Sequence, residues 1–369
     1  GIKKCYVPIE NVGECDFIKD LEIIGVENLN QLVMILATNM KPPEIKIIPQ
    51  ETEDYKDDFK NIKGQIQARK ASEIAAAGMH NMLMMGSPGV GKSIIAKTMP
   101  SILPDMTLEE QIEISKIQSV AGNLSGSLVK TRPVRSPHHT ATVSAMIGGG
   151  FNPKPGEITQ AHGGILFLDE LPEFSRQVIE TLRQPLEDEK IIVSRSGGTY
   201  EFPAKFILIG AMNPCKCGYY PDMNKCTCTE QEVKKYMEKI SGPLIDRIDL
   251  CVHMNQVTYF QLEKEEQPED SLTIKERVNR AVQIQRERYA NEKFKFNSQL
   301  SGENIKKYCK LNKEEQHLME KIYTTMDLSI RAYDKIIKVA RTIADLKQHE
   351  KIQQGDIAEA VSYRPVLFK

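Results

Sequence analysis

The sequence has no excess of charge of either sign. Its 49 lysines and arginines balance 50 aspartates and glutamates in 369 residues, which leaves a formal net charge of −1. Bulk charge therefore indicates no particular partner, and any nucleic-acid binding must come from a local patch. The chain also lacks an apolar run near the ~20 residues that cross a bilayer, and it lacks a signal peptide. We expect a cytoplasmic protein without membrane contact.

The cysteines lack the even spread of a secreted disulfide framework. Four of the eight form two C-x-C pairs between positions 215 and 228, and these candidate Zn²⁺ ligands are Cys215, Cys217, Cys226 and Cys228. Four thiolates at this spacing can surround one Zn²⁺, although C-x-x-C is the commoner pattern. Free thiols are the alternative, and disulfides come last in a reducing cytoplasm. His138 and His139 have no acid or cysteine at metal-binding spacing, so we expect structural or nucleotide-proximal packing.

One eight-residue string carries the strongest chemical signal. Residues 86–93 read G-S-P-G-V-G-K-S and follow the apolar run 81–85 directly. The pattern G-x-x-x-x-G-K-[ST] after a strand predicts a P-loop, in which backbone N–H groups surround phosphates at the start of a helix. Lys92 would serve phosphate oxygens and Ser93 the Mg²⁺. The predicted nucleotide-binding residues of this segment are Gly86, Ser87, Pro88, Gly89, Val90, Gly91, Lys92, Ser93 and Ile94.

A second motif extends phosphate binding to hydrolysis. The apolar run 164–168 ends in Asp169 and Glu170, and the carboxyl end of a parallel strand is where an α/β sheet binds ligands. We expect Asp169 to lie beside the Mg²⁺ and Glu170 to polarise the attacking water, with turn or capping roles as the alternative. Another apolar run, 206–211, leads to Asn213. Its carboxamide would lie near the γ-phosphate, or it would merely form a turn.

Two arginines are ambiguous when each is taken alone. Arg247 lies in a turn that enters an apolar segment, and Arg331 lies at the start of the predicted helix 329–349. Either guanidinium can neutralise charge that develops on a γ-phosphate. Taken alone, a surface ion pair is favoured, for Arg247 with Asp246 or Asp249.

The order of segments predicts an α/β fold with an all-α C-terminal part. The first 41 residues are too few for a core of their own, and an acidic linker with prolines follows over 42–58. Between 59 and 261, apolar strands alternate with helices, which predicts a parallel sheet covered on both faces. From 262 to 369 the periodicity is helical. The helices expected there are 274–289, 301–308, 313–326, 329–349 and 355–362.

The order of these motifs resembles an AAA+ ATPase from about residue 59 to 365. Four strings resemble, more narrowly, the ComM/YifB branch of magnesium-chelatase-like proteins. They are R-P-V-R-S-P-H-H at 132–139, P-K-P-G-E-I at 153–158, G-G-I-L-F-L-D-E-L-P-E-F at 163–174 and L-S-I-R-A-Y-D at 328–334. Residues 1–41 resemble the tail of that family's Lon-protease-like N-terminal domain. Since residue 1 is not methionine, we expect that the larger part of this domain is missing.

The resemblance implies a role for each matching position. Asn213 matches the first sensor, Arg247 an arginine finger that reaches into a neighbouring subunit, and Arg331 the second sensor in the lid. The loop that holds Ile62 resembles the segment that contacts adenine. A helix before the lid, for which 274–289 is the candidate, can displace the lid so that Arg331 acts on a neighbour's nucleotide. The family implies ATP and Mg²⁺, and a ring that is usually hexameric.

The same resemblance implies two hairpins that point into a ring channel. Lys154 lies in the insert 148–160, and Arg195 lies in the hairpin 191–202, which the residues themselves also favour. A single exposed cation is most often a solvated surface residue. Copies around a pore would instead form a concentrated phosphate-binding ring. We therefore expect Mg²⁺-dependent ATP hydrolysis that drives DNA branch migration in a homo-oligomeric ring.

Three rival functions stay open from the sequence. The ATPase subunit of a magnesium chelatase would drive metal insertion into a porphyrin, but the cysteine cluster, the R-S-P-H-H string at 135–139 and the Lon-like tail are not associated with that subunit. A non-motor adaptor would use ATP as an assembly switch, and it would carry Lys92, Asp169 and Glu170 as well. A Lon-type protease lacks support, because the chain does not contain the stretch that would hold a peptidase site.

Overall fold

The computed structural model describes two compact units. It describes residues 2–14, 21–38, 57–124, 128–150, 153–195, 198–257 and 268–364, with the backbone alone at Gly13, Glu14 and Arg195. One unit lies within 1–54 and 106–131, the other within 55–105 and 132–369. Most of the predicted linker 42–58 lies outside the described residues, as do 258–267. The domain boundaries expected near 41, 58 and 261 stay predictions.

The smaller unit contains a parallel strand pair. Strand β1 (Lys4–Pro8) pairs with β2 (Glu22–Val26), and a 3-10 helix, Ile9–Glu14, follows β1. Helix α1 (Leu29–Thr38) comes after β2. Helix α4 (Leu108–Ala121) belongs to the same unit and begins with a capping box, in which Thr107 and Glu110 satisfy each other's backbone N–H groups.

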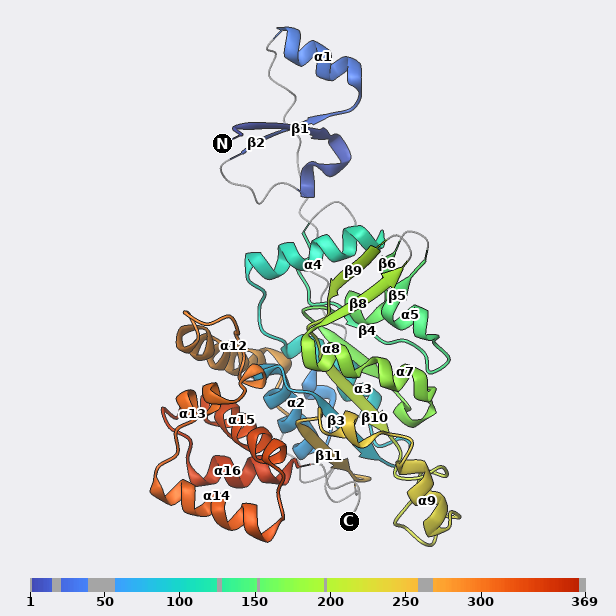
Figure 1. Ribbon diagram of the computed structural model, residues 1–369, viewed down its shortest axis with the longest axis vertical. Coiled ribbons are helices and arrows are strands. Elements are labelled where there is room, and N and C mark those ends of the chain that lie inside the picture. The colour runs from blue at the N-terminus through green and yellow to red at the C-terminus, as the bar shows by residue number, and fades with distance from the viewer. Residues whose placement is uncertain are drawn as a thin grey trace. The chain divides into compact units, whose positions relative to one another are not determined.

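Among the described residues of the larger unit, five strands form a parallel sheet in the order β11-β3-β10-β7-β4 (Figure 1). They are β3 (Met82–Gly86), β4 (Val134–Arg135), β7 (Ile165–Leu168), β10 (Ile207–Met212) and β11 (Leu250–Met254). Every residue of β3, β7 and β10 is buried. Complete burial is typical of parallel strands that are covered on both faces. The predicted α/β class is confirmed.

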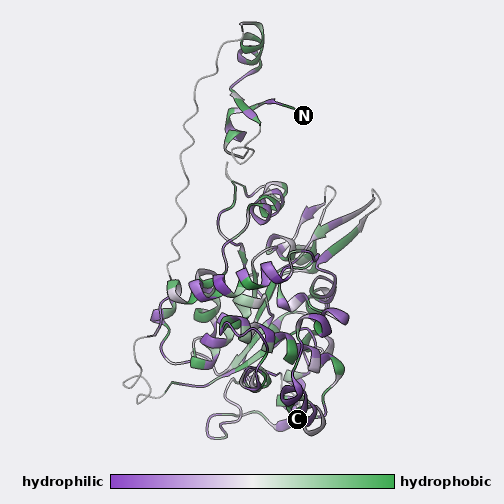
Figure 2. Ribbon diagram, turned by 90° about the vertical axis from the view of Figure 1, so that its left-hand side faces the viewer, coloured by the Kyte–Doolittle hydropathy of each residue, from purple (hydrophilic) through white to green (hydrophobic). Residues whose placement is uncertain are grey.

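Side chains of the sheet alternate between two cores, as the pleat requires. Met82 and Met84 of β3 join one core, and Leu83 and Met85 join the other. The first face is covered by α2 (Ile66–Gly78), α3 (Lys92–Thr98), α12 (Ser271–Arg288) and α15 (Ile330–Leu346). The second core includes residues of α5 (Val143–Ile147), α6 (Glu157–Gln160), α7 (Arg176–Thr181), α9 (Glu230–Met237) and α10 (Gly242–Ile245). Helices around the sheet carry both hydrophilic and hydrophobic segments (Figure 2).

The C-terminal part is helical, as predicted. After α12 come α13 (Glu303–Tyr308), α14 (Lys313–Thr325), α15 and α16 (Gln354–Ser362). Helix α12 begins at Ser271 because Asp270 accepts a hydrogen bond from the Thr273 N–H at 2.8 Å. The expected end of α15 at 349 is wrong by three residues, since the helix ends at Leu346.

Two antiparallel hairpins leave the larger unit on the same side (Figures 1 and 2). Strands β8 (Lys190–Arg195) and β9 (Gly198–Pro203) follow α8 (Arg183–Asp188) and form the hairpin expected at 191–202. Strands β5 (Gly148–Gly149) and β6 (Lys154–Pro155) lie in the insert expected at 148–160. Residues 151–152 and 196–197 lie outside the described residues.

Candidate nucleotide-binding site

The predicted P-loop connects the carboxyl end of β3 to the start of α3. Gly86 passes so close to β11 that a Cβ atom there would lie 2.4 Å from the Met254 carbonyl oxygen. Gly89 and Gly91 have φ angles of +80° and +98°, which glycine adopts without strain. Helix α3 then begins at Lys92. The loop therefore has the strand, turn and helix that phosphate binding at a helix N-terminus requires.

Lys92 and Ser93 connect this loop to two neighbouring strand ends. The Lys92 Nζ donates to the Gly86 and Ser87 carbonyls at 2.6 and 3.0 Å and to Asn213 Oδ1 at 3.1 Å. Ser93 Oγ donates to Asp169 Oδ2 at 2.7 Å. Burial lowers the pKa of Lys92, while the charges of Asp169 and Glu170 oppose the shift. The structure thus brings together the predicted cation, the first sensor and two oxygen donors suited to Mg²⁺.

Glu170 follows Asp169 in the left-handed region, at a φ of 51°. Its N–H donates to Asp169 Oδ1 at 2.9 Å, and its carboxylate is about half exposed. His139 Nδ1 lies 3.3 Å from Glu170 Oε2. The sequence predicted structural packing or packing near the nucleotide for the histidine pair. It did not predict this contact between His139 and the proposed water-activating acid. His139 follows β4, which pairs with β7. Strand β4 has only two residues and therefore shows no periodic pattern in the sequence.

The predicted adenine loop lies against the P-loop. Ile62 is buried, and Gln65 Nε2 donates to the carbonyls of Val90 and Asn255 at 3.1 and 2.7 Å. Asp58 fixes the start of the loop, because its carboxylate accepts hydrogen bonds from the backbone N–H groups of Lys60 and Ser271, each at 2.9 Å. The loop therefore connects the P-loop to the start of α12.

The four predicted zinc ligands converge beside the P-loop. The Sγ atoms of Cys215, Cys217, Cys226 and Cys228 all lie within 4.8 Å of one another. Neighbouring pairs are 3.3 to 3.8 Å apart, near the ~3.8 Å between sulfurs in a tetrahedral site with Zn–S bonds of about 2.3 Å. A backbone hydrogen bond at Tyr219 is the main cause that lowers the pKa of Cys217 to about 6. The donor set fits one metal ion.

The cysteine cluster packs directly on the P-loop. Gly218 lies between two of the cysteines, and a Cβ atom there would lie 2.6 Å from Pro88 Cδ and 3.9 Å from Asn213 Cγ. Cys215 is completely buried and stands two residues after Asn213. The position of the cluster is therefore set by contact with the loop and with the predicted first sensor.

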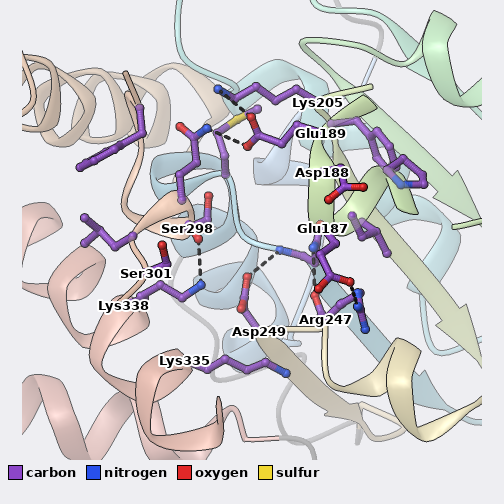
Figure 3. Close-up of a pocket in the computed structure, with 18 of the residues that line it drawn as sticks. Glu187, Asp188, Glu189, Lys205, Arg247, Asp249, Ser298, Ser301, Lys335 and Lys338 are labelled. Atoms are coloured by element: carbon purple, nitrogen blue, oxygen red, sulfur yellow. Dashed lines mark hydrogen bonds and ion pairs between the residues drawn. The ribbon is translucent and has the colours of Figure 1, made fainter. Parts of the chain in front are cut away.

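A second site lies at the opposite, amino ends of the strands. A cavity of about 640 Å³ is lined there by Asn81 before β3, Asp249 before β11, and residues of α8 and α15. Figure 3 shows Arg247 and Glu187 pointing toward each other in this cavity, where Arg247 Nη2 pairs with the Glu187 carboxylate. Arg331 also lines the cavity and lies 3.5 Å from the Asp246 carboxylate. The structure thus brings the two predicted arginines together, but not to the P-loop.

Arg247 keeps one donor without an acceptor. Its Nη1 donates to the Pro243 carbonyl at 2.7 Å, whereas its Nε is buried and has no hydrogen-bond partner in the described part of the chain. Lys335 of α15 holds the turn that carries Arg247, because its Nζ donates to the carbonyls of Ile245 and Ile248 at 3.1 and 2.8 Å. Burial lowers the pKa of Lys335 to about 8.

The two predicted DNA-contacting residues lie in the hairpins. Lys154 begins β6, and its side chain is exposed. Arg195 ends β8, and its side chain lies outside the described part of the structure. Lys154 is not among the residues that line the cavity of Figure 3.

Two family descriptions match the chain. They read "Magnesium chelatase, subunit ChlI" over residues 58–262 and "Magnesium chelatase, subunit ChlI C-terminal" over residues 268–364. The chain belongs to the magnesium-chelatase-like AAA+ family. Within this family it is 39% identical over 365 residues to the competence protein ComM of Haemophilus influenzae, which covers 97% of this chain and 71% of that protein.

Two other relatives show the range of the family. The chain is 42% identical over 311 residues to the uncharacterized protein YifB of Escherichia coli, covering 84% of this chain and 60% of that protein. It is 27% identical over 182 residues to the magnesium-chelatase 38 kDa subunit of Chlorobaculum parvum, covering 42% and 53%. The expected ComM/YifB resemblance is confirmed. Membership in this AAA+ family implies ATP and Mg²⁺ as ligands and an oligomeric state.

A membrane-spanning segment does not occur among the described helices, none of which is both long and apolar enough to cross a bilayer.

Proposed function

We propose that this chain is a Mg²⁺-dependent ATPase that works between the subunits of a ring and moves DNA. One observation carries the ATPase part: Lys92, Ser93, Asp169 and Asn213 are hydrogen-bonded to one another or to the P-loop at the carboxyl ends of the strands. The arginine cavity lies at the amino ends, one strand length of roughly 17 Å away for a five-residue strand. Because Arg247 faces away from its own P-loop, it is suited to a neighbour's nucleotide.

The proposed reaction assigns one task to each side chain. Ser93 and Asp169 would hold Mg²⁺, which supplies positive charge to the phosphate oxygens. Lys92 binds the phosphates. The oxygen of a water molecule attacks the γ-phosphorus, Glu170 takes the water proton, and the bond to the bridging oxygen breaks to leave ADP and phosphate. The neighbour's Arg247 neutralises charge on the γ-phosphate as it transfers.

The DNA part rests on the hairpins and on a relative's name. Lys154 is exposed in a hairpin of the magnesium-chelatase-like core. A ring would place one copy from each subunit around a channel, where repeated cations attract phosphates strongly even if the chain is neutral overall. A relative that is 39% identical is named for competence. We infer DNA branch migration as the work that hydrolysis drives.

The test is ATP turnover with and without single-stranded, duplex and forked DNA. We expect forked DNA to stimulate turnover several-fold, and the Lys92→Ala protein, purified in parallel, to measure any contaminating ATPase. Turnover that ignores all three DNA forms would contradict the motor while leaving ATP hydrolysis intact.

A magnesium-chelatase ATPase subunit is the second candidate, because both matching family descriptions carry that name. Such a subunit would respond to chelatase partner subunits and a porphyrin and not to DNA. The same DNA titration separates these two functions. A non-motor assembly switch would instead show slow turnover that neither DNA nor chelatase partner subunits change.

We also propose that the four cysteines hold one structural Zn²⁺. The distances between their sulfur atoms and the contact of Gly218 with Pro88 support this assignment. The ion would stiffen the segment that carries Asn213 and supports the P-loop.

A further inference from the structure

Lys335 of α15 contacts the backbone of the turn that carries Arg247. Its Nζ donates to the carbonyls of Ile245 and Ile248, at 3.1 and 2.8 Å, on either side of Arg247. Figure 3 shows Lys335 extending from α15, below Asp249 in this view. Ile245 ends α10, and the last carbonyls of a helix lack partners within it. A lysine ammonium can satisfy such carbonyls, so this contact holds the end of α10 and the turn together.

Arg331 lies one helical turn before Lys335 on α15. Residues four positions apart on a helix lie on the same face, and the Arg331 guanidinium lies 3.5 Å from the Asp246 carboxylate of the same turn. The Arg331 side chain is 75% exposed, so this ion pair contributes little. Lys335 therefore makes the stronger of the two contacts by which one face of α15 meets the turn that carries Arg247.

The core holds the same turn at other points. The Asn81 side chain donates to the Arg247 carbonyl at 2.9 Å, and the Asp249 carboxylate accepts a hydrogen bond from the Asn81 N–H at 3.3 Å. His80 Nδ1 lies 3.2 Å from the same carboxylate. These contacts come from residues that precede β3 and not from α15. We therefore expect the chain to fold without the Lys335 ammonium, with the turn displaced and not lost.

We propose that Lys335 is a positioning residue that fixes Arg247 for the nucleotide of a neighbouring subunit. A guanidinium acts on a γ-phosphate only if its backbone places it within hydrogen-bond distance, and a displacement of about 1 Å can lower a rate by about a hundredfold. Since Lys335 holds that backbone from α15, the C-terminal helices and the core together set the position of the finger. The role of Arg247 rests on the proposed function, whereas the contact of Lys335 with its turn does not.

The test compares Lys335→Met with Lys347→Met in the full chain, without DNA. Methionine approaches lysine in length but has no donor. We expect Lys335→Met to lower kcat by about tenfold to a hundredfold, at an unchanged Kd for a fluorescent ATP analogue, because its own P-loop is intact. Lys347 follows the end of the same helix and pairs with Asp356 and Glu359. It is not among the residues that line the cavity of Figure 3, so Lys347→Met should behave like the unmodified chain.

Mixing variants separates a displaced finger from a general loss of structure. Lys335→Met mixed with an equal amount of Glu170→Gln should recover about a quarter of the unmodified turnover, because the intact P-loop of the first meets the intact finger of the second at about that fraction of interfaces. Lys335→Met mixed with Arg247→Ala should recover nothing, since both variants have a defective finger. A chain with a general loss of structure would recover turnover with neither partner, and this result would overturn the proposal.

Failure of the inference differs from failure of the proposed function. If Arg247→Ala loses turnover but Lys335→Met keeps it, the finger stands and the role of Lys335 is wrong. The role of Lys335 is also wrong if Lys335→Met weakens ATP binding or recovers turnover when mixed with Arg247→Ala. If Arg247→Ala itself keeps full turnover, the finger is wrong and the role of Lys335 falls with it. DNA is absent throughout, so none of these results depends on the proposed motor.

Discussion

The P-loop site and the cavity of Figure 3 both contain side-chain cations, but these cations contact different kinds of groups. At the P-loop, the Lys92 ammonium contacts two backbone carbonyls and the Asn213 carboxamide, all neutral groups. In the cavity, Arg247 pairs with the Glu187 carboxylate, and Arg331 lies near the Asp246 carboxylate. A phosphate thus finds a cation without a direct carboxylate partner at the first site, whereas it must displace carboxylates at the second.

This difference supports the roles that we propose for the two sites. The Arg247 side chain is 16% exposed, so its ion pair is partly desolvated. The Arg331 side chain is 75% exposed, and its ion pair is therefore weak. A P-loop assembled within one chain can bind nucleotide alone. An arginine whose charge is neutralised by its own chain is suited to act only after a second copy presents a phosphate.

The broadest effects are expected at the P-loop site, where substitutions affect ATP binding as well as turnover. Glu170→Gln keeps the size of the side chain but removes the base, so turnover should fall by about two orders of magnitude or more while ATP still binds. Lys92→Ala removes the cation from the phosphates and should weaken binding itself. Titration with a fluorescent ATP analogue, together with steady-state turnover, measures both. Equal loss of binding in the two variants would contradict the assigned roles.

Arg247→Ala should lower turnover by about three orders of magnitude, the lower end of what an arginine finger contributes in related phosphoryl transfers. Binding of ATP should be unchanged, since the cavity is remote from the P-loop. Arg183→Ala is the matched control: it removes an exposed pair with Glu180 and should leave turnover largely intact. If both variants lose turnover to the same modest extent, Arg247 is only a surface ion pair.

The cysteine cluster should have an intermediate effect on the P-loop site. Purified protein should contain about one zinc per chain. Cys217→Ser combined with Cys228→Ser should abolish the metal and weaken nucleotide binding by roughly tenfold, or about 1.4 kcal/mol, because Gly218 no longer supports Pro88. Cys5→Ser, outside the cluster, is the control. Metal analysis near zero, with all four thiols titratable in the native protein, would support free thiols instead.

The smallest effect is expected from Glu187, which holds Arg247 within its own chain. Glu187→Gln removes the competing carboxylate and should raise turnover by about threefold or less, the range of a partly exposed ion pair. The gain should be largest at low protein concentration, where assembly limits turnover. Steady-state turnover as a function of protein concentration measures it, and a loss of turnover at every concentration would show that Glu187 supports the finger instead of competing for it.

The parts of the site that lie close together in the sequence could be predicted from it. The P-loop and the acids after β7 follow apolar runs directly, and the cysteine pairs lie within fourteen positions. Strand β3 begins at Met82, one residue after the predicted start, because the Asn81 side chain accepts a hydrogen bond from the Leu208 N–H and donates one to the Arg247 carbonyl.

The pairings between distant segments could not be predicted. His139 and Glu170 follow the paired strands β4 and β7 and lie 3.3 Å apart, but β4 is too short for a periodic pattern. Glu187 meets Arg247 across 60 positions. For Arg247, the expected surface partners Asp246 and Asp249 were wrong in detail, because the folded chain brings in an acid from α8. A carboxylate in a sequence gives no sign of which cation it will face.

Mixing two inactive variants tests the central claim, that the two sites belong to different subunits. Arg247→Ala has an intact P-loop and Glu170→Gln has an intact finger, and both should bind ATP. Random equal mixing should complete about a quarter of the interfaces, since each interface joins unlike faces of two subunits, and turnover should recover to about that fraction of the unmodified chain. If turnover stays at the level of the separate variants, at concentrations where light scattering shows mixed assemblies, the account is contradicted.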